Sequence, residues 1–210
     1  MSKVLYTCIT NNYDRLREVD APGWTKLCFT DNPELKSETW EVVQIQEPHS
    51  LIHREIKICP HRFFSFDAAL WIDGRTQVTC DLNKFVDGKM GVWLMEHPER
   101  DCIYQEAMVC TELQKDDPVV IRKQMDRYIE EGYPEHNGLC ATGIVYRENT
   151  VNIREAMEAW YQEVLYHSVR DQLSFNYIAW KYKVDYEMFF YSDGFTFWTH
   201  KNPKKIKKKL

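Results

Sequence analysis

Apolar and polar positions alternate in short blocks through the first half of the chain. Six apolar runs are rich in β-branched and aromatic residues and are bounded by turn-forming residues, which is the pattern of β-strands. They span residues 3–10, 25–31, 40–46, 68–74, 77–80 and 91–97. Residues 50–62 instead repeat their apolar positions at helical spacing, and Pro60 ends or kinks this predicted helix.

Helical spacing dominates the second half. A helix is predicted from Pro118 to about Gly132, because Asp117 is a good N-cap and proline is tolerated in the first turn. A strand follows, and then two more helices, at 138–147, 151–166 and 171–183. Alternating strands and helices predict an α/β fold with a mainly parallel central sheet flanked by helices.

Length and composition set the outer limits. The chain has 210 residues, 44% hydrophobic and 28% charged, so we expect one folded domain over residues 1–200. No apolar run is long enough for a transmembrane segment, and no secretory leader is recognisable. We therefore expect an intracellular, cytoplasmic protein, in the host cytoplasm if the protein is viral.

Charge is distributed unevenly. Six of the 27 basic residues lie in 201–210, so 21 basic residues face 32 acidic ones in the rest. This acidic body argues against nucleic acid as a partner. The basic tail is interpreted as a linker toward a further domain, or as a segment that binds anionic surfaces. Seven scattered cysteines without a C-x-x-C pair predict buried free thiols rather than disulfides or a zinc site.

Strand ends carry the first candidates for chemistry, because ligands of parallel sheets bind beyond the carboxyl ends of the strands. Asp31, Asp73 and His97 each follow an apolar run. Asp73 is the most informative of them. A carboxylate there could bind a hard divalent cation while Gly74 lets a phosphate approach, or the pair could be an ordinary Asp-Gly turn.

Six segments together resemble a GT-A-fold (Rossmann-like) glycosyltransferase. They are YTCITNNYD, CFTDNPEL, HREIKICPHRFFSFDAALWIDG, GLCATGIVYREN, RDQLSF and WTHKNPK. Their order is similar to the retaining family of glycogenin and the lipopolysaccharide galactosyltransferases. It is closer to a family of bacterial, plant and viral domains with the WIDG strand and the RDQLSF helix start. The resemblance covers nearly the entire chain, and it implies transfer of a sugar from a UDP-sugar to a glycan or glycoprotein acceptor, in a viral context for capsid glycan synthesis.

Carried over to matching positions, the resemblance implies a donor site built from strand ends and the first helix. Tyr13 would stack on the base and Asp31 would accept from the uracil edge, although Asp31 also suits an Asx turn. Arg54 and Lys57 would face the ribose, phosphates or sugar, although such a pair is also typical of a solvated face. The complete donor set is Thr7, Ile9, Thr10, Tyr13, Asp31, Arg54, Lys57, Asp73, Gly74, Arg75, Thr142, Gly143 and Lys201.

The resemblance also implies a Mn²⁺ or Mg²⁺ ion held by Asp73 and His200. Here the chain departs from the family pattern. The usual motif is Asp-x-Asp, whereas this chain reads Asp73-Gly74-Arg75. Either Asp73 is the one ligand from the motif, or the cation is weakly held, with Arg75 partly neutralising the diphosphate.

Asp171 and Gln172 are the catalytic candidates, because they match the pair that contacts the donor sugar in the retaining family. The alternative for Asp171 is a helix N-cap. His97, Arg100 and Glu106 are candidates for acceptor binding. Because the second acid of the motif is missing, a catalytically inert nucleotide-sugar- or carbohydrate-binding domain of the same fold remains the alternative function.

Overall fold

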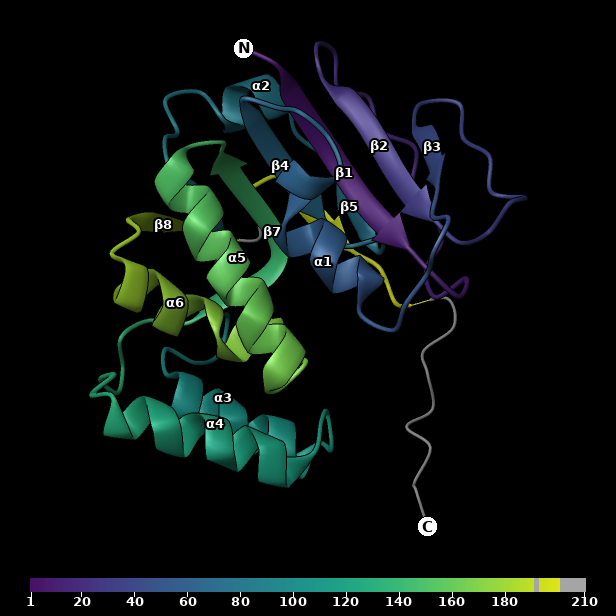
Figure 1. Cartoon of the computed structure of the whole chain (residues 1–210). Coiled ribbons are helices and arrows are strands. Elements are labelled where there is room, and N and C mark those ends of the chain that lie inside the picture. Colours follow the sequence, from purple (N-terminus) through teal and green to yellow (C-terminus); the bar gives the residue numbers. More distant parts are fainter. Residues whose placement is uncertain (191–192, 201–210) are drawn as a thin grey trace.

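A seven-stranded mixed sheet forms the centre of the protein (Figure 1), in a computed structural model that describes residues 1–190 and 193–200. Its strand order is β3-β2-β1-β4-β7-β6-β8. Neighbouring strands run parallel except β7, which is antiparallel to both β4 and β6. The strands are β1 (Lys3–Ile9), β2 (Thr25–Thr30), β3 (Glu41–Gln44), β4 (Ala68–Ile72), β6 (Val92–Glu96), β7 (Cys140–Glu148) and β8 (Tyr186–Phe189).

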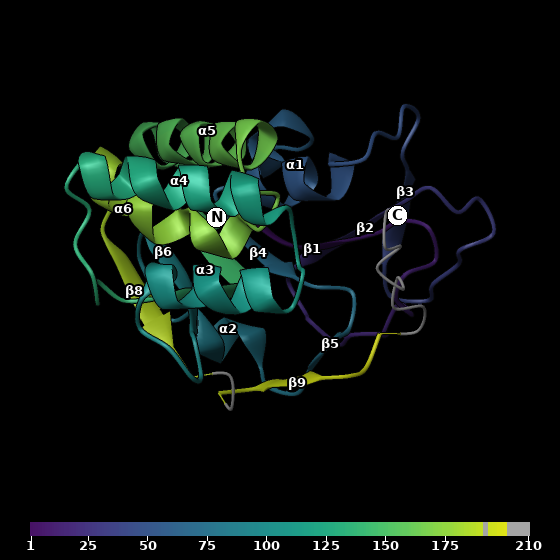
Figure 2. The ribbon, with the colours of Figure 1, turned by 90° about the horizontal axis from the view of Figure 1, so that it is seen from below.

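Helices cover one face of this sheet and a smaller layer covers the other (Figure 2). The first layer contains α1 (Ile52–Ile58), α5 (Val151–Tyr166) and α6 (Phe175–Tyr182). The opposite layer contains α2 (Leu82–Phe85) and an antiparallel ribbon of β5 (Thr76–Val78) and β9 (Phe195–Phe197). Helices α3 (Ile103–Glu112) and α4 (Pro118–Glu130) pack on each other below the sheet in Figure 1.

The sheet is buried on both faces, as its sequence pattern requires. Alternate residues of β1 enter different apolar clusters, because successive side chains of a strand point to opposite faces. Tyr6 packs in the cluster beneath the helical layer, whereas Leu5 packs in the cluster beneath α2 and the ribbon. Strands covered on both sides read as continuous apolar runs, which explains the clear strand signal at 68–72.

The predicted fold class is confirmed. Each of the six predicted N-terminal strands is present, five of them with shorter ends and the one at 77–80 shifted to Thr76–Val78. The predicted cap Asp117 accepts from the backbone amide of Val119. One expected helix was wrong in its start: residues 171–173 form a 3₁₀ turn, and α6 begins at Phe175. Helix α3 and strands β8 and β9 were not predicted.

Three further expectations concern the basic tail, a membrane-crossing helix and the state of the cysteines. The basic tail at 201–210 lies outside the described residues. No helix among residues 1–190 and 193–200 combines the length and the apolar character that crossing a membrane requires. The cysteines in this part of the chain are all free thiols, as predicted.

Candidate active site

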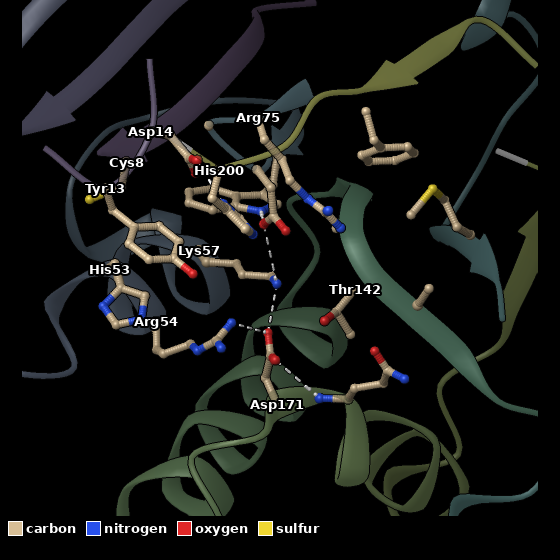
Figure 3. A pocket seen from close by; sticks show the side chains of 18 of the residues that line it. Cys8, Tyr13, Asp14, His53, Arg54, Lys57, Arg75, Thr142, Asp171 and His200 are labelled. Carbon is tan, nitrogen blue, oxygen red and sulfur yellow. Dashed lines mark hydrogen bonds and ion pairs between the residues drawn. The ribbon is translucent and has the colours of Figure 1, made fainter. Parts of the chain in front are cut away.

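A cavity of about 730 Å³ opens at the carboxyl ends of β1, β4 and β6, beside the start of β7. Figure 3 shows side chains from both halves of the chain converging on it. The structure brings together most of the residues predicted for the site. Those that line the cavity are Ile9, Thr10, Tyr13, Arg54, Lys57, Asp73, Gly74, Arg75, His97, Thr142, Gly143, Asp171, Gln172 and His200.

Four predicted residues lie away from the cavity lining. Thr7 is buried within β1, and the Asp31 carboxylate accepts from the Asn11 amide at 2.9 Å. Arg100 and Glu106 form an ion pair at 2.7 Å behind His97, which does line the cavity. A fifth predicted residue, Lys201, lies outside the described part of the chain.

Asp73 lies at the end of β4, and one of its carboxylate oxygens already accepts a hydrogen bond. Its Oδ1 accepts from the Trp71 indole at 2.8 Å and lies 3.7 Å from the Lys57 ammonium. Its backbone amide donates to the Gly143 carbonyl at 2.9 Å. These contacts fix the direction of the carboxylate, and its side chain is still about one third exposed to the cavity.

Close backbone approach explains the two glycines beside Asp73. A Cβ on Gly74 would lie 2.8 Å from Ile9 Cγ1 and 3.0 Å from Asp14 Cβ. A Cβ on Gly143 would lie 3.4 Å from Asp73 Oδ2 and 3.3 Å from the Met95 methyl group. Gly74 therefore permits the β4–β5 turn to touch the loop after β1, which brings Asp14 to the edge of the cavity.

Asp14 was not predicted from the sequence, yet it connects two predicted parts of the site. Its Oδ1 lies 2.7 Å from His200 Nδ1 (Figure 3). If Asp14 is ionised it accepts from Nδ1–H, so the lone pair of a neutral His200 ring is left on Nε2. A carboxylate behind a histidine is the usual way to orient an imidazole that binds a metal.

Lys57 and Asp171 form the buried part of the site. The Lys57 ammonium lies 2.6 Å from Asp171 Oδ2, and the Arg54 guanidinium lies 2.9 Å from the same oxygen. Burial alone would raise the pKa of Asp171, but the charges of Arg54 and Lys57 hold this pKa below its usual value. Asp171 is therefore ionised, and Arg54 and Lys57 neutralise its charge at Oδ2. It is not a helix N-cap, because Arg170 and Ser174 occupy the cap positions.

His53 is another cavity residue that the sequence did not single out. Burial and the neighbouring Arg54 charge lower the pKa of His53 to about 4. Its imidazole is therefore neutral near pH 7 and can both donate and accept a hydrogen bond. It is a half-buried residue on α1 beside Arg54, and a polar side chain at this position gave no signal in the apolar pattern.

A second group of possible metal ligands lies outside this cavity. Within the described residues, Cys59, His61 and Glu158 bring three ligand atoms within 4.8 Å of one another. Both Glu158 oxygens, however, accept from the Arg62 guanidinium, and one also pairs with His61 at 2.7 Å. Burial raises the pKa of the Cys59 thiol to about 12, so the thiol is neutral. We interpret this group as an ion-pair network that joins the Pro60–Arg62 turn after α1 to α5.

Comparison with known proteins assigns the family. Residues 30–197 match the TOD1/MUCI70, glycosyltransferase-like domain. The chain belongs to this family. The matched residues span more than half of the chain and include the ends of β2, β4 and β6 as well as Asp171. The mixed sheet flanked by helices agrees with this match to a glycosyltransferase-like domain.

None of the curated proteins matches the sequence. Among solved structures, mouse xyloside xylosyltransferase 1 in its apo form is similar, with a TM-score of 0.49 and 9% sequence identity. The match covers 90% of this chain and 85% of that chain. Similarity at this level carries no argument about the donor or the acceptor of the TOD1/MUCI70 domain described here.

Proposed function

We propose that the protein is a divalent-metal-dependent glycosyltransferase that moves a sugar from a UDP-sugar to a glycan acceptor. One observation carries the proposal. Asp73, the Asp14–His200 pair and the cations Arg54 and Arg75 converge on one cavity at the strand ends. A cavity of this size holds a nucleotide-sugar, and its cations suit a diphosphate.

The donor is proposed to extend across the strand ends. The base lies toward Tyr13, whose ring packs 4.5 Å from the His200 ring. The diphosphate lies between Asp73 and the Arg75 guanidinium. The sugar lies toward Thr142, Gly143 and the 171–172 turn.

The chemistry of the side chains fits a hard divalent cation. Asp73 Oδ2 and His200 Nε2 are the proposed ligand atoms, and Asp14 orients the His200 ring. Carboxylate oxygens suit Mn²⁺ and Mg²⁺, and imidazole is compatible with Mn²⁺. A bound cation would neutralise charge on the departing diphosphate. Arg75, in the position of the missing second acid, would add a positive charge at the same group.

Transfer breaks the bond between the anomeric carbon and the diphosphate oxygen. The acceptor hydroxyl forms the new glycosidic bond, and its proton leaves with the UDP product. If the sugar keeps its configuration, the acceptor oxygen enters on the face from which the diphosphate departs. Asp171 does not serve as a free nucleophile, because its carboxylate is bonded to Arg54 and Lys57. Asp171 is proposed to hold these cations in place, while Gln172 contacts the sugar.

Calorimetric titration of UDP in the presence of Mn²⁺ tests this function. The proposal predicts binding that EDTA abolishes and that Asp73→Asn weakens at least tenfold, which is about 1.4 kcal/mol of binding free energy. Asp87→Asn is the matched control, since Asp87 is an exposed acid beyond α2. Equal affinity with and without EDTA would contradict metal dependence. Absence of UDP binding under every condition would contradict the function.

An inert nucleotide-sugar-binding domain is the second candidate. The observation that favours it is Arg75, which replaces an acid at the usual metal motif and adds positive charge to the cavity. Such a domain would bind UDP-sugars as tightly as an enzyme but would release no UDP from them. Binding and turnover measured on the same preparation therefore separate the two functions.

A further inference from the structure

A second, smaller cavity of about 350 Å³ adjoins the proposed donor site. It shares Asp14, Arg75 and His200 with the larger cavity, so the two are separated by these side chains. In Figure 3 the three side chains lie together at the edge of the donor cavity, away from Asp171. The remaining lining of the smaller cavity comes from Arg15, Arg17, Trp198 and Thr199.

Positive charge dominates this cavity. Three arginines line it, and Asp14, the acid among its lining residues, is already paired with His200. Among the residues that the structure describes, none of the three guanidinium groups has a carboxylate partner. Within residues 1–190 and 193–200, the buried Nε groups of Arg17 and Arg75 have no hydrogen-bond acceptor. Buried donors without an acceptor are costly, so a ligand that supplies an acceptor gains free energy here.

An aromatic surface stands beside the charges. The Trp198 side chain is 48% exposed, which is unusual for so large an apolar group. The Arg17 guanidinium lies 4.3 Å from the centre of the Trp198 ring, which restrains both groups. The Trp198 backbone amide donates to the Arg75 carbonyl at 2.9 Å, which connects the residue carrying this indole to the edge of the donor site. An exposed indole suits the apolar face of a sugar ring.

We propose that this cavity binds the acceptor, and that the acceptor is a glycan carrying an anionic group beside the sugar that contacts Trp198. Arg15 and Arg17 bind the anion, which is a carboxylate or a phosphate, and the sugar ring packs on the indole. This inference rests on the proposed glycosyltransferase function. It specifies the acceptor class of the same reaction, because the cavity meets the donor cavity at Arg75 and His200.

Arg15 and Arg17 make the two sites separable. They line the smaller cavity but not the larger one, whereas Arg75 lines both. Changing Arg15 and Arg17 to Gln removes two positive charges from the acceptor cavity and leaves the proposed metal and diphosphate residues in place. Arg122→Gln is the matched control, since Arg122 is an exposed arginine on α4 that lines neither cavity.

NMR titration of the isotope-labelled protein tests the proposal through the arginine Nε–H signals. The probes are methyl β-glucuronide, glucose-6-phosphate, the neutral methyl β-glucoside and inorganic phosphate. The expected result is that an anionic sugar shifts the Arg17 and Arg75 Nε–H signals and binds at least tenfold more tightly than the glucoside. The carboxylate and phosphate arms then show which anion is preferred. Arg15→Gln/Arg17→Gln loses this preference, and Arg122→Gln keeps it.

Each other outcome has a definite meaning. Equal binding of glucuronide and glucoside, or an unchanged preference in the double variant, would overturn the anionic acceptor. Inorganic phosphate that binds as well as glucose-6-phosphate would overturn the role of Trp198 as a sugar platform. UDP titrated into the same sample provides the separation from the proposed function. Failure to bind UDP refutes the donor site, whereas normal UDP binding without an anionic-sugar response refutes this inference alone.

Discussion

Replacing Asp171 with asparagine tests the buried charge cluster directly. The Asp171 carboxylate is 3% exposed and bonds to a Lys57 ammonium that is 1% exposed. Asparagine keeps the shape of the side chain but removes the charge. Lys57 would then keep Asp73, at 3.7 Å, as its remaining carboxylate partner. Taking one partner away from a buried ion pair is much more costly than losing an exposed pair, because the other charge stays desolvated.

The expected loss is about 3 kcal/mol of unfolding free energy at pH 7, near the lower end of the range for broken buried pairs. The lower end applies because Arg54 is 18% exposed and Lys57 retains Asp73. For a chain of this length, such a loss lowers the melting temperature by roughly 6–12 °C. Denaturant titration measures the change, and Asp126→Asn is the control, since Asp126 is exposed on α4.

The pH dependence gives an independent check. The folded pKa of Asp171 is below its value in the unfolded chain, because Arg54 and Lys57 stabilise the ionised form. Its contribution is therefore complete above the unfolded pKa of about 3.9 and is lost as the pH falls below that value. The stability difference between wild type and Asp171→Asn should shrink as the pH falls below about 4. A difference below 1 kcal/mol at pH 7, or one that grows on acidification, would refute the reasoning.

Three further predictions follow from other contacts. Gly74→Ala should reduce UDP affinity at least tenfold in calorimetry, because its Cβ would overlap Ile9 and displace Asp14; unchanged affinity would show that the turn yields easily. His53 should stay neutral down to about pH 4 in an NMR titration, because it is buried beside Arg54, and protonation near pH 6.5 would contradict its placement. Glu163→Gln should cost about 2 kcal/mol in denaturant titration, because three donors share one Glu163 oxygen, and a neutral result would refute that network.

The central sheet could be predicted because its strands are buried on both faces. Ala68–Ile72 is continuously apolar and fully buried. This short segment alone therefore predicts both the strand and the position of Asp73 at its carboxyl end. Helix α3 was missed because it begins after Cys102 without a side-chain cap. Strands β8 and β9 have four and three residues and were missed, whereas β5, which is equally short, was predicted from the apolar run at 77–80.

Site residues that follow a strand directly were predicted from the sequence. Those whose role depends on a partner far away in the sequence were missed. Asp73 follows an apolar run and was found. The role of Asp14 depends on its contact with His200, which is 186 residues away in sequence. No local sequence pattern could therefore have identified it. Asp171 was considered as a helix cap because Asp at a helix start is common. Its partners Arg54 and Lys57 come from α1, and this contact exists only in the folded chain.

Release of UDP from a panel of UDP-sugars, measured with Mn²⁺ on protein that has been shown to bind UDP, tests the central claim most directly. The account predicts that at least one UDP-sugar is consumed, faster when an anionic glycan acceptor is added. Asp73→Asn should abolish this release and Asp87→Asn should preserve it. Tight UDP binding without consumption of any UDP-sugar, with or without acceptor, would contradict the account and identify the protein as an inert binding domain.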